Sequence, residues 1–232
     1  MTRNLTSPLR VIVPMKPLHQ AKSRLWANVP TLECESVTLL MLDTVVRAAV
    51  AALGPAAVRV IGGDALVQSV VSDAGATWEQ DPGGGLNPSV RFAMQSAYDD
   101  GCAAALFMPG DLPMLEADDI AAIVEASRDN TRPVGVRAEP DGGTNALLVP
   151  AACVFGPRLG ERSFAKHTAA AEEVGVTLTA LDLPRVAFDM DSFEDMVWAR
   201  ENITGFAQKL YDWQDRLRRS PRNSMNSAKE NA

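Results

Sequence analysis

Residues 103–113 read Ala103-Ala104-Ala105-Leu106-Phe107-Met108-Pro109-Gly110-Asp111-Leu112-Pro113 and give the clearest indication of the fold class. The first six residues form an unbroken apolar run of strand length, which is typical of a parallel-sheet strand covered by helices on both faces. Gly110 allows an immediate turn, and Pro113 disfavours a helix interior directly after it. Asp111 is therefore expected at the carboxyl end of a central strand, where open α/β sheets bind their ligands. The competing interpretation is that Asp111 only caps the helix that begins near Glu116.

On both sides of this stretch, short apolar segments alternate with segments of helical periodicity. Strands are expected at 9–13, 58–61, 77–78, 103–108, 133–136 and 176–181, with another entered through 142–145. Helices are expected at 31–53, 65–73, 88–100, 115–128, 163–174 and 192–217. This alternation predicts an α/β fold in which a mostly parallel mixed sheet is flanked by helices. One domain is expected over 9–215, between a disordered lead-in at 1–8 and a basic, disordered tail at 216–232.

The composition is that of an ordinary globular protein, with 47% apolar and 22% charged residues among 232. The net charge of −7 argues against a nucleic-acid partner bound through a basic surface. The three cysteines lack a zinc-type spacing, which predicts a reducing cytoplasm and no zinc site. Because no signal core is visible and no segment looks long and apolar enough to span a bilayer, no membrane association is expected.

Three basic residues, Lys16, Lys22 and Arg24, lie in the loop that follows the first expected strand. Cations and loop amides there could offset the charge of a nucleoside triphosphate. The alternative is a solvated basic loop. The phosphate-loop pattern GxxxxGK[ST] and the dinucleotide pattern GxGxxG are both absent, which argues against those nucleotide-binding classes.

Three consecutive glycines, Gly83 to Gly85, precede Asn87 and a helix. Glycines at a helix N-terminus let the backbone approach a flat ligand or a phosphate, and the Asn87 amide could pair with a base or a ribose. The alternative is a flexible surface loop.

A second polar region follows later in the chain. Gly142-Gly143-Thr144-Asn145 enters an apolar strand and suits contacts to an anionic substrate, or else forms an ordinary turn. Ser163 is expected to be the N-cap of a helix whose start, beside Arg162 and Lys166, could bind an anion. His167 is expected to be a substrate-side or packing residue rather than a metal ligand, because no ligand cluster surrounds it.

Two further acids, Asp189 and Asp191, project to the same side if their segment is extended. Together with Asp111 they could hold a hard divalent cation through oxygen ligands. The alternative is that both act as helix-dipole partners. Ser192 and Asp195 resemble a capping box that starts the last helix.

The motifs in their order resemble the 2-phospho-L-lactate guanylyltransferase family, which makes the guanylylated precursor of the deazaflavin coenzyme F-420. The resemblance covers about residues 10–200 and is carried by Pro14-Met15-Lys16, Ala21-Lys22-Ser23-Arg24-Leu25, Gly83-Gly84-Gly85-Leu86-Asn87, Asp111-Leu112-Pro113, Gly142-Gly143-Thr144-Asn145-Ala146-Leu147-Leu148, Phe155-Gly156, Ser163-Phe164, His167 and Asp189-Met190-Asp191. One departure is Gly110, where alanine is more usual.

The resemblance implies a single-domain nucleotidyltransferase fold (Rossmann-like, GT-A-like) that uses GTP and a small phosphorylated acid. Carried over by position, Lys16, Lys22 and Arg24 would meet the triphosphate and serve catalysis with Asp111, while Gly84, Gly85 and Asn87 would lie along the nucleoside. Thr144, Gly160 and Ser163 would bind the acid, and Asp111, Asp189 and Asp191 would hold Mg²⁺. A downstream transferase of the same pathway is a further expected partner.

The expected reaction is attack by the acid's phosphate on the α-phosphorus of GTP, with pyrophosphate released. Two other hypotheses remain at this point. Asp189-Met190-Asp191 also fits the DxD metal site of a nucleotide-sugar glycosyltransferase, although the basic N-terminal loop suits a triphosphate better. The other is a module that binds GTP without turnover.

Overall fold

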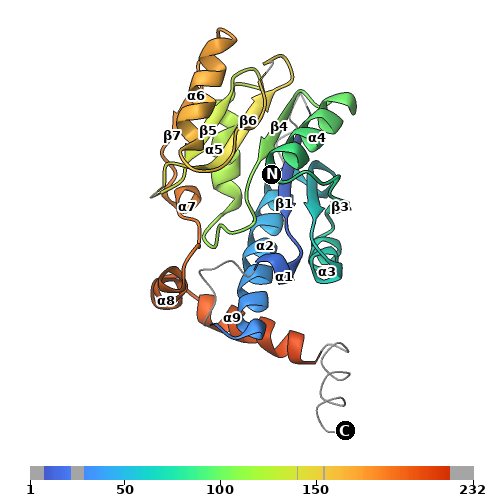
Figure 1. Ribbon diagram of the computed structural model, residues 1–232, viewed down its shortest axis with the longest axis vertical. Helices are drawn as coiled ribbons and strands as arrows, with labels where there is room; N and C mark the ends of the chain where they lie inside the picture. The colour runs from blue at the N-terminus through green and yellow to red at the C-terminus, as the bar shows by residue number, and fades with distance from the viewer. Residues whose placement is uncertain (1–7, 22–28, 140, 154, 220–232) are drawn as a thin grey trace.

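The computed structural model describes residues 8–21, 29–139, 141–153 and 155–219. Within these residues, seven strands form one sheet in the order β3-β2-β1-β4-β6-β5-β7 (Figure 1). They are β1 (Leu9–Met15), β2 (Val58–Gly62), β3 (Thr77–Glu79), β4 (Ala104–Phe107), β5 (Val134–Arg137), β6 (Thr144–Pro150) and β7 (Thr179–Leu181).

One strand, β6, runs against the others. It pairs antiparallel with both β4 and β5, whereas the pairs β1–β2, β1–β4, β2–β3 and β5–β7 are parallel. The amino end of β6 therefore lies at the same edge of the sheet as the carboxyl ends of the six other strands. This arrangement confirms the expected mostly parallel mixed sheet, and it brings Thr144, the first residue of β6, to the ligand-binding edge.

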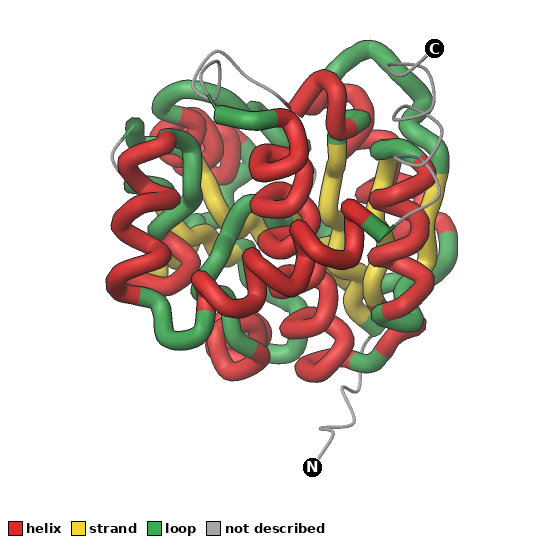
Figure 2. The backbone as a smooth tube through the Cα atoms, turned by 90° about the horizontal axis from the view of Figure 1, so that it is seen from below, coloured by secondary structure: helices red, strands yellow, loops and turns green. Residues whose placement is uncertain are grey.

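The helices cover both faces of the sheet, as the red and yellow tubes of Figure 2 show. Their bounds are α1 (Leu18–Ala21), α2 (Thr31–Leu53), α3 (Ala65–Asp73), α4 (Leu86–Asp99), α5 (Ala117–Ala126), α6 (Ser163–Glu173), α7 (Pro184–Ala187), α8 (Phe193–Asn202) and α9 (Phe206–Arg218), with a 3₁₀ turn, η2, at Pro55–Ala57. Buried side chains of α2, α3 and α5 pack on one face, and those of α4 and α6 pack on the other.

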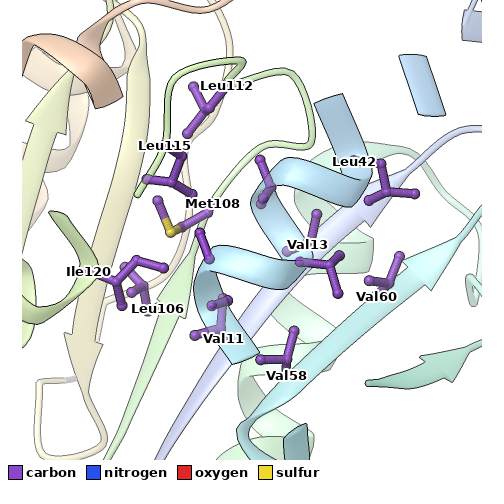
Figure 3. Packing of buried hydrophobic residues seen from close by; sticks show 14 of the residues in the cluster. Val11, Val13, Leu42, Val58, Val60, Leu106, Met108, Leu112, Leu115 and Ile120 are labelled. Carbon is purple, nitrogen blue, oxygen red and sulfur yellow. The ribbon is translucent and has the colours of Figure 1, made fainter. Parts of the chain in front are cut away.

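Alternating side chains of the central strands fill these two cores. Val11 and Val13 of β1 face the α2 side, and Ile12 faces the α4 side. Figure 3 shows Val11, Val13, Leu106 and Met108 packed around α2. Burying each such side chain contributes about 1.5–3 kcal/mol, which explains why the apolar runs of β1 and β4 lie at the centre of the sheet.

Helix α2 is apolar on more than one side. It is long and apolar enough to cross a membrane, with 23 residues and a mean hydropathy of 1.7, so the expectation that no segment qualifies was wrong. Leu39, Leu42 and Val45 join the core above the sheet, whereas Leu40 and Met41 join a third core with α8 and α9. A helix that packs on two sides becomes hydrophobic nearly all round.

The predicted long helix over 192–217 is wrong. The chain breaks it at Gly205, whose φ of +76° lies in the left-handed region, and α8 and α9 are separate helices. Helix α9 also continues to Arg218 with Leu217 buried, so regular structure extends beyond residue 215. The Ser192–Asp195 capping box at the start of α8 is confirmed, with both of its hydrogen bonds present.

Candidate active site

The predicted site residues lie on segments that leave or enter this one edge of the sheet. Lys16 follows β1 directly, Gly84 and Gly85 lie between β3 and α4, and Asp111 follows β4. Gly160 precedes α6, while Asp189 and Asp191 lie between α7 and α8. Lys22 and Arg24 lie outside the described residues, so their part in the site stays a prediction.

Close contacts link these segments. A Cβ placed on Gly110 would lie 2.5 Å from the Sδ of Met15, so glycine there lets the loop before Asp111 approach the residue before Lys16. Met190 donates its backbone N–H to the carbonyl of Asp111 at 3.1 Å. The segments that carry Lys16, Asp111 and the Asp189–Asp191 pair are therefore neighbours.

The carboxyl group of Asp111 lies deep in this site. Its Oδ1 is buried and has no hydrogen-bond partner among the described residues. Burial first, and then the charges of Asp189 and Asp191, raise the pKa of Asp111 from 3.8 to about 7. The interpretation of Asp111 as a helix cap is wrong, because α5 begins at its own N-cap, Glu116.

Asp189 and Asp191 flank a buried anchor. Met190 is 2% exposed and packs in the third core with α2, α8 and α9. Burial and the charge of Asp191 raise the pKa of Asp189 to about 6, while a hydrogen bond from Asn145 acts in the opposite direction. Burial and the nearby charge of Asp195 raise the pKa of Asp191 as well.

These three acids suit a hard divalent cation chemically. Their donors are all carboxylate oxygens, and a nearby cation would favour the ionised forms, which burial and the mutual repulsion of the three charges disfavour. In the described part of the chain no three histidine, cysteine or carboxylate side chains already stand at the spacing of a bound metal ion. The carboxylates of Asp111, Asp189 and Asp191 would therefore have to move closer together to bind one ion.

Two residues near these acids were not expected beside them from the sequence. Asn145 donates from Nδ2 to the carbonyls of Val186 at 3.0 Å and Ala187 at 3.3 Å, which ties the start of β6 to α7. Asp141 accepts a hydrogen bond from the N–H of Gly143 at 2.6 Å, and its charge adds to the rise in the pKa of both Asp189 and Asp191. The sequence Asp-Gly-Gly-Thr-Asn predicted a turn, but it did not predict that Asp141 lies near Asp189 and Asp191.

An ion pair also holds α7, which leads into Asp189. Asp119 is 4% exposed and accepts two hydrogen bonds from Arg185, from Nε at 2.9 Å and from Nη2 at 2.8 Å. This two-pronged geometry fixes orientation as well as charge. The partners lie 66 residues apart, so no local pattern could have shown the pair.

The glycine loop, Gly83 to Gly85, is exposed to solvent and is held at its start by a hydrogen bond to Asp81. Gly83, Gly84 and Gly85 are exposed and have φ values of +89°, +87° and +96°. Asp81 Oδ1 accepts hydrogen bonds from the N–H of Gly83 at 2.8 Å and from the hydroxyl of Ser89 at 2.5 Å. No side chain in the described part of the chain caps the start of α4, so the first amides of this helix are available to an anion.

Asn87 lies in the first turn of α4 and uses its amide within the protein. Its Nδ2 donates to the carbonyl of Leu159 at 3.0 Å, and its Oδ1 accepts from the N–H of Leu159 at 2.6 Å. The amide thus links the glycine loop to the loop before α6. Pairing of the same amide with a base or a ribose, as expected from the sequence, would have to compete with these two bonds.

A buried polar group lies at the start of β6. Thr144, Ser163 and His167 are 6%, 1% and 0% exposed. The hydroxyls of Ser163 and Thr144 lie 3.0 Å apart, and Nδ1 of His167 lies 3.0 Å from the Thr144 hydroxyl. The structure therefore brings together Thr144 and Ser163, which the resemblance assigns to one subsite.

Ser163 is not the N-cap of α6. The N-cap is Arg162, with a left-handed φ of +51°, and Ser163 is the first helical residue. Ser163 donates its N–H to the carbonyl of Gly160 at 3.0 Å, while its hydroxyl is turned to Thr144 instead of the helix end. The exposed Gly160 is thereby held close to Ser163.

Comparison with solved structures supports this fold. A protein from Desulfovibrio desulfuricans G20 superposes with a TM-score of 0.69 at 16% identity, covering 97% of this chain and 96% of that one. A cytidylyltransferase from Leptospira borgpetersenii has a TM-score of 0.58 at 11% identity, covering 93% and 95%. At such identities the likeness concerns the fold alone.

Comparison of sequences goes further. The chain is 37% identical over 199 residues to the phosphoenolpyruvate guanylyltransferase of Rubrobacter xylanophilus, covering 85% of this chain and 95% of that protein. It is 32% identical over 209 residues to the 3-phospho-D-glycerate guanylyltransferase of Phenylobacterium zucineum, covering 85% and 93%. Residues 9–229 match the family described as guanylyl transferase CofC like. The chain therefore belongs to the CofC-like guanylyl transferase family and is a nucleotidyltransferase.

Proposed function

We propose that this enzyme transfers GMP from GTP to the phosphate of a small phosphorylated hydroxy acid and releases pyrophosphate. The acid would be 2-phospho-L-lactate, phosphoenolpyruvate or 3-phosphoglycerate. The observation that carries the proposal is the buried, unpartnered carboxylate oxygen of Asp111 beside Asp189 and Asp191, at the sheet edge that also bears Lys16 and the glycine loop. The names of the relatives support two of the three acids.

The acceptor needs little activation. A phosphomonoester has a second pKa near ~6, so at neutral pH its oxygen is already largely ionised and no general base is required. A bond forms between this oxygen and the α-phosphorus of GTP, and the bond from the α-phosphorus to the bridging oxygen of pyrophosphate breaks. The main obstacle is repulsion between two anions that must approach in line.

Residues of this chain would reduce the repulsion between the two anions and orient them. Lys16, exposed directly after β1, offers a positive charge to the triphosphate. The glycine loop offers uncapped amides at the start of α4. Thr144 and Ser163 would orient the acid from the start of β6, and Gly160 would do so from the loop before α6.

Asp111, Asp189 and Asp191 would hold Mg²⁺. When bound, such an ion supplies positive charge to the phosphate oxygens and helps to orient them. The same ion would offset the cost of the buried Asp111 carboxylate.

We place the reaction in coenzyme F-420 biosynthesis, in the cytoplasm. The product joins guanosine and the acid through an activated pyrophosphate linkage. A downstream transferase that displaces GMP from this linkage would consume it, and that transferase is the partner we expect.

The first test measures pyrophosphate release. The purified protein with GTP, Mg²⁺ and each of the three acids should release pyrophosphate and form the guanylylated acid, seen by mass spectrometry, and excess EDTA should stop the reaction. ATP should be a poorer donor, because a wrong purine leaves polar groups unpaired. Turnover in excess EDTA would remove the metal from this proposal. Absence of pyrophosphate with every acid, combined with hydrolysis of a nucleotide sugar, would favour the glycosyltransferase alternative.

The second test uses the pKa of Asp111. The folded group, with a pKa of about 7, keeps a proton that the unfolded group, at 3.8, gives up. Unfolding therefore releases a proton, and the stability of the metal-free protein falls as pH rises from about 4 to about 7. Asp111→Asn should remove this cost, which is on the order of a few kcal/mol at about 1.4 kcal/mol per pKa unit.

Urea unfolding in EDTA at pH 5 and pH 8 measures this effect. The gain from Asp111→Asn should be larger at pH 8, and added Mg²⁺ with GTP should stabilise wild type but not the variant. Asp182→Asn, at an exposed aspartate outside the cluster, is the control and should show no such pH dependence. An equal gain at both pH values would mean that Asp111 is not held with a raised pKa.

The third test concerns the anchor between the two outer acids. Met190→Ala and Met196→Ala both remove a fully buried methionine from the third core, so each should cost about 2–5 kcal/mol of stability. Only Met190 lies between Asp189 and Asp191. Met190→Ala alone should raise, several-fold, the Mg²⁺ concentration that gives half-maximal rate. An equal rise in both variants would assign the effect to general loosening of the core.

A further inference from the structure

His167 is a buried titratable residue to which the reaction gives no task. It is 0% exposed in α6, and both of its ring nitrogens have polar partners. The N–H of Arg158 lies 2.7 Å from Nε2, and the hydroxyl of Thr144 lies 3.0 Å from Nδ1. Its neighbours thus belong to the acid subsite on one side and to the preceding loop on the other.

These partners determine the tautomer of the ring. A backbone N–H can only donate, so Nε2 must be the unprotonated acceptor. Burial, together with the charges of Arg158 and Lys166, lowers the pKa of His167 to about 4, so the ring is neutral near pH 7. A neutral ring without a proton on Nε2 carries it on Nδ1, and Nδ1 therefore donates to the Thr144 hydroxyl.

The direction of this bond constrains the two hydroxyls. Thr144 accepts from His167, and one further hydrogen bond, of 3.0 Å, joins Thr144 to Ser163. Two hydroxyl hydrogens are available for that single bond. Whichever hydroxyl donates, one hydrogen is left without an acceptor among the described residues. The pair is therefore a net donor, which suits an anionic group.

The same ring also holds the loop before α6. Arg158 gives its N–H to His167, and the next residue, Leu159, makes two hydrogen bonds with Asn87 at the glycine loop. Gly160 follows directly. The position of the acid subsite relative to the glycine loop thus depends on the consecutive residues Arg158, Leu159 and Gly160. His167 holds the first of these, Arg158.

We propose that His167 is a positioning residue for the acceptor, which fixes the Thr144–Ser163 hydroxyl pair as a hydrogen-bond donor to the phosphate or carboxylate of the acid. Its identification with the acid subsite rests on the proposed function. The ring touches neither substrate and acts through Thr144.

Two amide variants separate the two bonds of the ring. In His167→Asn, the amide nitrogen can take the place of Nδ1 and still donate to Thr144, while the acceptor for Arg158 is lost. In His167→Gln, the amide oxygen can reach the place of Nε2 and accept from Arg158, while the donor to Thr144 is lost. Each variant thus keeps one bond and removes the other.

His167→Gln should raise KM for phosphoenolpyruvate or 3-phosphoglycerate about tenfold or more, which corresponds to one hydrogen bond to a charged group. Its KM for GTP should stay within about twofold of wild type. His167→Asn, which keeps the donor to Thr144 but frees the loop at Arg158, should raise KM for the acid less than His167→Gln does, and it should lower Tm. A rise in KM for both substrates in both variants, or a change in Tm alone, would mean a merely structural role and would overturn the proposal.

The tautomer can be measured without turnover. The chain has only two histidines, so His19→Gln assigns both ring signals in a long-range ¹H–¹⁵N spectrum of the whole protein. At pH 7 the ring of His167 should be neutral with its proton on Nδ1. A proton on Nε2, or a charged ring, would overturn the inference even if the enzyme is active. The expected tautomer in a protein that releases no pyrophosphate would instead count against the proposed function.

Discussion

The site depends on a carboxylate that the fold removes from water. Strand β4 is buried on both faces, so the loop that follows it starts inside the protein. As a result, Oδ1 of Asp111 is shielded from solvent. An ionised carboxylate in such a place is costly unless positive charge is brought to it. Asp189 and Asp191 add negative charge nearby and so increase that cost. In our account a divalent cation offsets it, and its place at the sheet edge is set by core packing.

The reversed strand β6 explains how the second substrate reaches the same edge. In a fully parallel sheet the residue that begins a strand would lie at the opposite edge from the carboxyl ends. Because β6 runs the other way, its first residue, Thr144, lies at the edge where β4 and β5 end. The loop before α6 then returns towards α4 and is tied to Asn87 through Leu159. The two loops that would bind the two substrates are thus joined by hydrogen bonds even without ligands.

The sequence was sufficient for those features that depend on local chemistry. Helices α2 and α3 have the predicted bounds, because Gly54-Pro55 stops one and Asp64 caps the other. Asp111 was placed correctly after β4, because a long apolar run followed by a turn has few other solutions. Asp189 and Asp191 were expected near Asp111 because all three could serve as oxygen ligands of one cation, and not from the fold, since both lie between α7 and α8.

The remaining features depend on partners far apart in the chain. The amide of Asn87 was expected to face a ligand, but its partner Leu159 is 72 residues away and could not be identified from spacing. The prediction of Ser163 as N-cap failed because Arg162 adopts a left-handed conformation, which frees the hydroxyl for Thr144. The break at Gly205 was missed because apolar periodicity continues across it. The second apolar side of α2 is explained only by its packing on α8 and α9.

We propose that a cation bound at the end of β4 joins the nucleotide to the sheet edge. Crystals grown with Mn²⁺ and a GTP analogue that resists cleavage between the α- and β-phosphates allow a direct test by anomalous diffraction at the manganese edge. We predict a manganese peak within coordination distance of oxygens of Asp111 and of Asp189 or Asp191, in contact with the analogue's phosphates. A bound analogue with manganese elsewhere, or with no manganese, would contradict it.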